Sequence, residues 1–290
     1  MSTTRKKKVV ICGGGLVGAL NACFFAKKGW DVEVYEYRPD PRTQKFVHGR
    51  SINLAASVRA RSALAAVQLE EELVNGGIPM YGRYVHNQDG ATGFFVPYGR
   101  KDQYILSVNR RHLNEIMLTE AEKCSSVKMK FSAKIKNCDP TQGSVCVEDR
   151  NNRREETVKA DLIIACDGAY SAVRQSLMKQ PGFNYSQDYI EHGYIELCIQ
   201  PTKDDKFQMK PNMFHLWPRG NFTLIALANL DKTFTVTLFA PWKIFDELTN
   251  RSAVFEFFDT NFPDALRMIG RESVAETFAK VNPSALVSVK

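Results

Sequence analysis

The segment from Lys8 to Gly18 constrains the fold of this chain more than any other feature. An apolar run, Val-Val-Ile-Cys, is followed by glycines at the spacing Gly-x-Gly-x-x-Gly, which are Gly13, Gly15 and Gly18. The run predicts a buried parallel strand, and the apolar, alanine-containing stretch 16–27 predicts the helix behind it. In such a unit the first glycine permits a tight turn and the second lets the backbone approach a pyrophosphate. The third lets the helix pack on the strand.

An acidic residue follows at the distance expected for a dinucleotide site. Residues 32–35 indicate a second strand that ends in Glu36, 18 positions after Gly18. A carboxylate there can accept hydrogen bonds from an adenosine ribose, and the helix N-terminus offers free N–H groups to a pyrophosphate. A glycine triplet alone is equally compatible with a flexible surface loop. The full order of strand, glycines, helix, strand and acid predicts that the chain binds a dinucleotide.

Composition restricts the class of protein. The 290 residues are 44% hydrophobic and 24% charged with a net charge of +7, as in a globular chain of one large or two ordinary domains. This charge suits an anionic cofactor or a negatively charged membrane surface, and no basic stripe interleaved with aromatic residues indicates a nucleic-acid partner. The seven cysteines form no Cys-x-x-Cys pair, which favours a reducing intracellular compartment.

Periodicity predicts an α/β fold with two kinds of layer. Helices are expected at 57–74 and 110–123, and a buried strand at 161–166. Residues 80–105 alternate short strand-like pieces with glycine turns, which indicates antiparallel sheet. Further antiparallel strands, and then two helices, are expected at 193–199, 213–217, 222–228, 234–239, 243–249 and 251–259. The pattern predicts a parallel nucleotide-binding layer interrupted by an antiparallel sheet that can cover a ligand.

A second motif lies about 150 residues beyond the glycines. The strand at 161–166 runs into Asp167-Gly168, and a helix is expected to begin at Ser171. Alone, Asp167 is better explained as a helix cap, worth on the order of 1 kcal/mol. However, Asp-Gly-x-x-Ser-x-Val-Arg resembles the second motif of single-component flavoprotein hydroxylases, whose aspartate and arginine stand near the flavin and the passing NADPH. Together the two motifs favour FAD over NAD as the resident cofactor.

Six further segments are similar to the kynurenine 3-monooxygenase family, in order along essentially the whole chain. They are residues 50–55, 78–83, 96–98, 104–110, 185–197 and 216–219. The resemblance implies a Rossmann-like FAD-binding domain of the aromatic-hydroxylase type with an inserted antiparallel β-sheet substrate domain. The FAD-binding domain would comprise residues 1–75 and 106–182, and the substrate-binding sheet with its helices residues 76–105 and 183–285.

The resemblance also implies roles for individual residues. Arg83 and Tyr98 would hold a substrate carboxylate, which suits a guanidinium fork and a phenol donor. Phe239 would form an aromatic wall against the substrate ring. A solvated charge is the alternative for Arg83, and core packing for Phe239. The residues that would line the flavin are Gly13, Gly15, Val17, Gly18, Glu36, Arg38, Ala55, Arg110, Ile135, Asp167 and Gly168.

The implied reaction consumes NADPH and O2 and hydroxylates L-kynurenine at its 3-position. No catalytic residue of the chain is assigned, because the cofactor supplies the hard chemistry. The five histidines lack the spacing of metal ligands. Two alternatives stay open: a related flavin hydroxylase of another amphipathic aromatic substrate, and a catalytically impaired fragment that binds a nucleotide or a partner.

The chain departs from the family pattern at its end. The family carries a third motif beginning Gly-Asp, and none of the 18 glycines here is followed by aspartate. The resemblance therefore implies a truncated chain that lacks this motif and the hydrophobic anchor that holds the family on the mitochondrial outer membrane. Because a parallel sheet without one strand exposes an edge, we expect this chain to bind FAD weakly, to hydroxylate kynurenine poorly and to be cytoplasmic.

Overall fold

In the computed structural model, which describes residues 5–44 and 53–290, four parallel strands form the first sheet. They are β1 (Lys8–Cys12), β2 (Asp31–Tyr35), β8 (Val127–Lys130) and β12 (Leu162–Ala165), in the order β12-β1-β2-β8. Helices α1 (Leu16–Lys27) and α4 (Arg110–Glu122) cover one face. The small residues Ala19 and Ala22 let α1 pack closely on Ile11. The predicted strand–helix–strand unit is confirmed.

A three-stranded antiparallel sheet covers the other face of the parallel sheet. Its strands are β9 (Ala133–Asp139), β10 (Ser144–Asp149) and β11 (Glu155–Lys159), and helix α5 (Ala172–Leu177) packs beside β9. Because successive strand residues face opposite sides, Val10 and Cys12 point into this second core while Ile11 points to the helices. The parallel sheet is therefore buried on both faces, except at its edge strand β12, where the strand predicted to be buried has Leu162 38% exposed.

A small three-stranded sheet links the parallel sheet with the seven-stranded sheet described next. It has the order β3-β7-β4, from β3 (Asn53–Ala56), β4 (Gly77–Met80) and β7 (Ile105–Asn109), with the short helix η1 (Pro41–Thr43) preceding it in the chain. The single helix predicted at 57–74 is wrong, since α2 (Val58–Ala65) and α3 (Glu70–Asn75) are separate. Gln68 between them has a φ of 65°, which an α-helix cannot contain. The break lets Leu64 and Leu69 both be buried.

The largest sheet has the strand order β17-β13-β16-β15-β14-β5-β6. Its strands are β5 (Gly82–His86), β6 (Gly93–Pro97), β13 (Gln187–Ile199), β14 (Phe214–Arg219), β15 (Phe222–Ala228), β16 (Phe234–Pro241) and β17 (Ser284–Val289). All neighbours pair antiparallel except β14 with β5. The predicted hairpin of β14 and β15 is confirmed.

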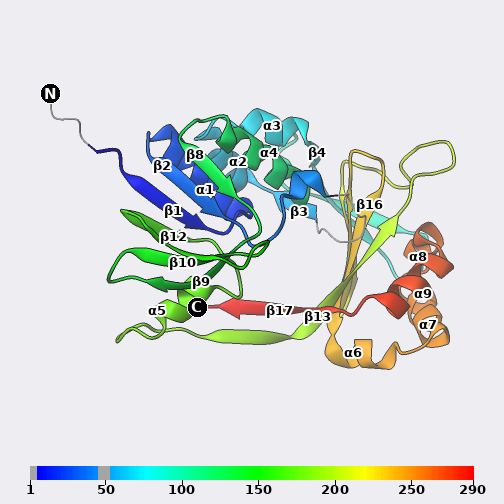
Figure 1. Cartoon of the computed structure of the whole chain (residues 1–290). Helices are drawn as coiled ribbons and strands as arrows, with labels where there is room; N and C mark the ends of the chain where they lie inside the picture. Colours follow the sequence, from blue (N-terminus) through cyan, green and yellow to red (C-terminus); the bar gives the residue numbers. More distant parts are fainter. Residues whose placement is uncertain (1–4, 45–52) are drawn as a thin grey trace.

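Helices cover only one face of this sheet (Figure 1). They are α6 (Trp242–Glu247), α7 (Arg251–Asn261), α8 (Pro263–Ile269) and α9 (Arg271–Lys280), of which the sequence predicted the first two. Phe234, Val236 and Leu238 of β16 point into the core beneath them. The intervening residues of β16 point to the other face, on the side of the parallel sheet (Figure 1). We call this face, which α6–α9 do not cover, the open face, although Thr235 and Thr237 on it are buried.

A buried chain of polar groups crosses the core under the large sheet. His86 Nδ1 lies 2.8 Å from Asp264 Oδ2, and His86 Nε2 lies 2.9 Å from His215 Nδ1. His215 Nε2 donates to the carbonyl oxygen of Lys210 at 2.9 Å. Because a carboxylate and a carbonyl only accept, His86 Nδ1 and His215 Nε2 are the donors at the two ends of this polar chain.

The titration of His215 makes stability depend on pH. Burial lowers the pKa of His215 to about 4, from an ordinary value of 6.5. The unfolded chain therefore binds more protons than the folded chain between these values, so stability falls as the pH is lowered through this window. We expect a loss on the order of 3 kcal/mol in urea unfolding between pH 7 and pH 4. His215→Gln, although less stable at pH 7, should show a shallower slope.

The matched control is His112→Gln on α4, which should keep the wild-type slope. An unchanged slope in His215→Gln would show that this imidazole does not titrate with folding.

Candidate dinucleotide site and substrate face

The two sequence motifs meet at the carboxyl edge of the parallel sheet. Strands β1 and β12 are direct neighbours, so Gly13 and Asp167 follow adjacent strand ends. Gly13 has a φ of 101°, and a Cβ there would lie 2.4 Å from the carbonyl oxygen of Cys166. Its N–H donates to the Tyr35 carbonyl at 2.8 Å. A side chain at Gly13 is therefore excluded both by conformation and by the neighbouring turn.

The glycine turn is closed toward the protein and open on its other side. A Cβ at Gly18 would lie 1.8 Å from the Gly13 carbonyl oxygen, whereas one at Gly15 would meet no atom within 4 Å. Gly15 precedes the first turn of α1, and no side chain caps this helix. Val17 in that turn is 63% exposed. The turn thus offers uncapped N–H groups and the positive end of a helix to an approaching anion.

The Glu36 carboxylate lies at the end of β2, beside the glycine turn. Its Oε2 accepts from the Gly14 N–H at 2.7 Å and its Oε1 from the Arg38 N–H at 2.9 Å. Each carboxylate oxygen has a further lone pair. These two bonds fix the orientation of the side chain and leave it able to accept from a ligand hydroxyl.

Asp167 acts on the helix that follows it and keeps one oxygen unused. Its Oδ2 accepts from the N–H groups of Ala172 and Val173 at 2.8 and 3.2 Å, so Asp167 caps α5. Its Oδ1 is buried and has no hydrogen-bond partner. An unpaired buried acceptor costs about 1–3 kcal/mol, which a donor from a bound ligand can offset. Gly168, with a φ of 79°, lies exposed next to it.

Helix α4 approaches the glycine turn from the side. Asn114 Nδ2 donates to the Gly14 carbonyl at 3.2 Å, and Asn114 Oδ1 is buried without a partner. Arg110, one helical turn earlier and exposed, lies on the same helix face. Sequence reasoning missed Asn114, whose only signal is its four-residue spacing from Arg110.

Two residues predicted to line the flavin differ in their surroundings. Ala55 is exposed on β3, opposite Ser107 of β7. Ile135 is 8% exposed, and its side chain packs in the core between the parallel sheet and β10. The Ile135 side chain therefore belongs to the hydrophobic core, and any contact with a ligand would have to come from its backbone.

Arg83 and Phe239 both lie on the open face of the large sheet. Strand register puts Arg83 beside Phe214, and Phe239 beside Thr223 and Tyr194. The Phe239 and Tyr194 rings are 5.9 Å apart between centroids. Phe239 is thus half-buried on the open face and takes no part in the core beneath the helices.

Arg83 and Tyr98 are in contact. The guanidinium carbon of Arg83 lies 5.4 Å from the centre of the Tyr98 ring. Burial raises the pKa of the Tyr98 phenol, and the charge of Arg83 partly offsets this rise, so Tyr98 is a neutral donor at physiological pH. Among the described residues, no carboxylate forms an ion pair with Arg83. The pair can therefore accept an anionic group.

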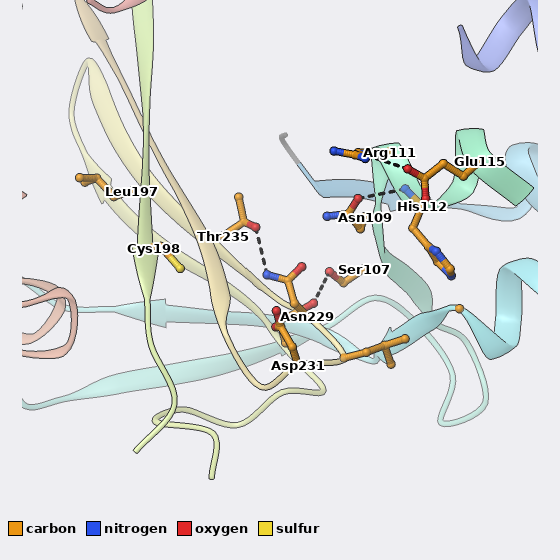
Figure 2. Close-up of a pocket in the computed structure, with 13 residues that line it drawn as sticks. Ser107, Asn109, Arg111, His112, Glu115, Leu197, Cys198, Asn229, Asp231 and Thr235 are labelled. Atoms are coloured by element: carbon orange, nitrogen blue, oxygen red, sulfur yellow. Dashed lines mark hydrogen bonds and ion pairs between the residues drawn. The ribbon is translucent and has the colours of Figure 1, made fainter. Parts of the chain in front are cut away.

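A cavity of about 360 Å³ lies where the small linking sheet meets the large one (Figure 2). Ser107, Asn109 and His112 contribute from β7 and α4, and Cys198 and Thr235 from the open face. Arg83, Tyr98 and Phe239 do not line it. The residues predicted for the substrate thus lie elsewhere on the same face.

A polar network around Asn53 joins the two sheets near this cavity. Asn53 Nδ2 donates to Asn229 Oδ1 at 2.7 Å and to Ser107 Oγ at 3.1 Å. The Ser107 hydroxyl donates to the Ala228 carbonyl at 2.7 Å, and the Thr235 hydroxyl donates to Asn53 Oδ1 at 3.3 Å. Asn53 follows directly on residues 50–52, which lie outside the described part of the chain.

A parallel β-α-β unit with a glycine turn at its carboxyl edge defines the class of dinucleotide-binding α/β proteins. Within that class, the chain belongs to the FAD binding domain family, whose match covers residues 6–283. The predicted fold class is therefore confirmed, and FAD, the predicted cofactor, is the cofactor of this family.

Curated relatives show which enzymes the chain is similar to in sequence. The chain is similar to kynurenine 3-monooxygenase of Caenorhabditis elegans, with 54% identity over 97% of this chain and 64% of the relative. It is also similar to the same enzyme of Sus scrofa, with 45% identity over 100% and 61%, and of Candida albicans, with 41% identity over 96% and 62%. The chain thus spans about three fifths of the length of these relatives.

Solved structures share the fold. The tetrameric form of 2-methyl-3-hydroxypyridine-5-carboxylic acid oxygenase has a TM-score of 0.73 at 17% identity, covering 99% of this chain and 72% of that chain. PqsL of P. aeruginosa in complex with 2-aminobenzoylacetate has a TM-score of 0.67 at 17% identity, with coverages of 99% and 73%. At these identities the likeness concerns the fold alone.

In residues 5–44 and 53–290, no helix is long and apolar enough to cross a membrane. In the same residues, no group of three or more histidine, cysteine, aspartate or glutamate side chains could hold a metal ion.

Substitutions at two glycines should separate folding from cofactor binding. Gly18→Ala puts a methyl group against the Gly13 carbonyl, so we expect a loss of about 3 kcal/mol in unfolding free energy. Gly15→Ala projects into open space at a φ of −69°, so its cost should stay below about 1 kcal/mol. Its methyl group blocks close approach of a pyrophosphate, and FAD affinity, measured by fluorescence quenching, should fall at least tenfold.

Gly29→Ala is a useful comparison, because Gly29 has a positive φ, an unobstructed Cβ position and no place in the glycine turn. It should lose some stability but keep FAD affinity. Equal FAD affinity in Gly15→Ala and wild type would contradict the assignment of this turn.

Proposed function

We propose that this chain binds FAD and L-kynurenine as part of an NADPH-consuming flavoprotein monooxygenase that forms 3-hydroxykynurenine. The observation that carries the proposal is the meeting of the glycine turn and the Asp167-Gly168 turn at one sheet edge, together with an open face of the large sheet that lies on the side of the parallel sheet (Figure 1) and carries Arg83 by strand register. The identity of 38–54% with kynurenine 3-monooxygenases supports this substrate over other aromatic compounds.

Unused polar groups around the glycine turn suit FAD. The uncapped α1 N-terminus at Gly15 would receive the pyrophosphate, and Glu36 the adenosine ribose. The buried Asp167 Oδ1 has no partner among the described residues and would accept a hydrogen bond from a hydroxyl of the cofactor. Arg110 would reach a phosphate. When bound, FAD supplies the redox chemistry by which NADPH and O2 are consumed and one oxygen atom enters the substrate.

The chain itself would bind and orient the substrate. Arg83 would bind its carboxylate through two parallel N–H···O bonds, and the neutral Tyr98 phenol would donate a third. The Phe239 ring would bound the aromatic end. Apolar residues of the open face would keep water away from the ring. These roles leave the chain without a nucleophile or a general base, in keeping with cofactor-borne chemistry.

Two further assignments belong to this proposal. Residues 1–75 and 106–182 would form the FAD-binding domain and residues 76–105 and 183–285 the substrate domain, although β4 of the second range pairs with β7 of the first. The site of action would be the mitochondrial outer membrane, to whose anionic surface a net charge of +7 is suited.

Replacing Arg83 should weaken substrate binding without affecting the cofactor. Since a charge-assisted hydrogen bond is worth about 1.5–3 kcal/mol, Arg83→Met should raise the dissociation constant for L-kynurenine roughly 10- to 100-fold. FAD absorbance of the purified chain should be unchanged. Arg83→Lys keeps the charge but lacks the two parallel N–H donors, so its dissociation constant for L-kynurenine should lie between those of wild type and Arg83→Met. Kynurenine binding by calorimetry and kynurenine-dependent NADPH oxidation provide the measurements.

Arg100→Met is the matched control, because Arg100 is also exposed and follows the same hairpin. Its dissociation constant for L-kynurenine and its FAD absorbance should equal those of wild type. A purified chain that binds neither FAD nor kynurenine, or an Arg83→Met chain with wild-type affinity, would contradict the proposal.

A further inference from the structure

The side chain of Glu196 on β13 is not explained by the folding of the chain. Its Oε2 is buried and has no hydrogen-bond partner. Burial alone raises the pKa of this carboxyl, with no neighbouring charge contributing. Although Glu196 as a whole is half-buried, a buried carboxylate oxygen without a partner destabilises a folded protein, so its presence points to a donor that arrives with a ligand.

Strand register fixes where Glu196 points. Ile195, Leu197 and Ile199 of β13 lie in the core beneath the helices, so Glu196 faces the opposite side, the open face. Its direct partner on β16 is Thr237, and Phe239 is its diagonal neighbour. Such neighbours are about 7–8 Å apart, within reach of long side chains. Glu196 therefore stands beside the ring proposed to bound the aromatic end of the substrate.

The open face carries opposite chemistry at its two sides. Four strand spacings separate β13 from β5 in the sheet order, or roughly 19 Å between the backbones of Glu196 and Arg83. The row from Glu196 continues across the sheet through Thr237, Ile225 and Leu216. The face thus offers a guanidinium at one side, a carboxyl at the other, and a largely apolar floor between them. An extended aromatic amino acid with a polar ring substituent matches this pattern.

We propose that Glu196 is a specificity-determining residue, whose Oε2 accepts a hydrogen bond from the ring amine of an aromatic amino acid held at its carboxylate by Arg83. The inference rests on the proposed function and deepens it, since L-kynurenine carries such an amine. Glu196 would thereby select aminoaryl substrates over the same compounds without the amine. An accepting oxygen is present whether or not the carboxyl is protonated, so the contact does not depend on its ionisation.

Two ligands and three variants test the inference. The FAD-loaded 290-residue chain is titrated calorimetrically with L-kynurenine and with its analogue lacking only the ring amine. We expect wild type to prefer kynurenine at least tenfold, as for loss of a hydrogen bond that leaves a buried acceptor unpaired. In Glu196→Leu, kynurenine should bind as weakly as the analogue binds to wild type, and the affinity for the analogue should be unchanged. Glu196→Gln retains an acceptor and should keep part of the preference.

Stability provides a second readout that separates this role from a structural one. Within residues 5–44 and 53–290, Glu196 forms no hydrogen bond or ion pair that Glu196→Leu would break, so its melting temperature should equal or exceed that of wild type. Glu191→Leu, an exposed position on the same strand, should leave the ligand preference unchanged. A lower melting temperature with a retained preference would assign Glu196 to folding.

Failure of the inference and failure of the proposed function give different results. If wild type binds both ligands equally, or Glu196→Leu keeps the preference, the inference is overturned while the proposed function stands. If wild type binds neither ligand although it binds FAD, the proposed substrate is wrong, and the inference falls with it.

Discussion

The hydrogen-bond network around Asn53 determines how the two layers of this protein meet. Asn53 on the linking sheet bonds to Ser107 within that sheet and to Asn229 on the large one, and nearly all of it is inaccessible to water. Unpaired polar groups in such a position are costly, so only an arrangement that satisfies every member is stable. The network therefore holds the linking sheet against the large sheet. The proposed cofactor and substrate residues lie on the layers that it joins.

Local sequence patterns predicted the elements whose conformation is determined by their own residues. The strand, glycine turn and helix from Lys8 onward follow in part from Gly13 and Gly18, where backbone atoms occupy the space of a side chain. Elements shaped by distant contacts were not predictable. The break at Gln68 exists because two leucines reach a core formed with other segments. Likewise, β12 shows the composition of a buried strand, and only the sheet order makes it an edge.

The same distinction applies to the candidate site. Gly13 and Asp167 stand in recognisable turns, so they could be named from the sequence, although only the pairing of β1 with β12 brings them together. Asn114 and Glu196 could not be named, because a polar residue in a helix or a strand has the pattern of a solvent-facing position. Their burial arises from tertiary packing, and their unpaired oxygens become visible only when each donor around them has been assigned.

The large sheet packs one face against helices and leaves the other without them. Alternate residues of each strand therefore belong to different faces. Along β16, Phe234, Val236 and Leu238 hold the core, whereas the half-buried Phe239 lies on the open face, where the proposed substrate would touch it. Mutation at the first set changes packing, and mutation at Phe239 is expected to change recognition. Substrate preference in such a sheet can therefore evolve at alternate positions without passing through misfolded intermediates, because the two selective pressures act on different residues of the same strand.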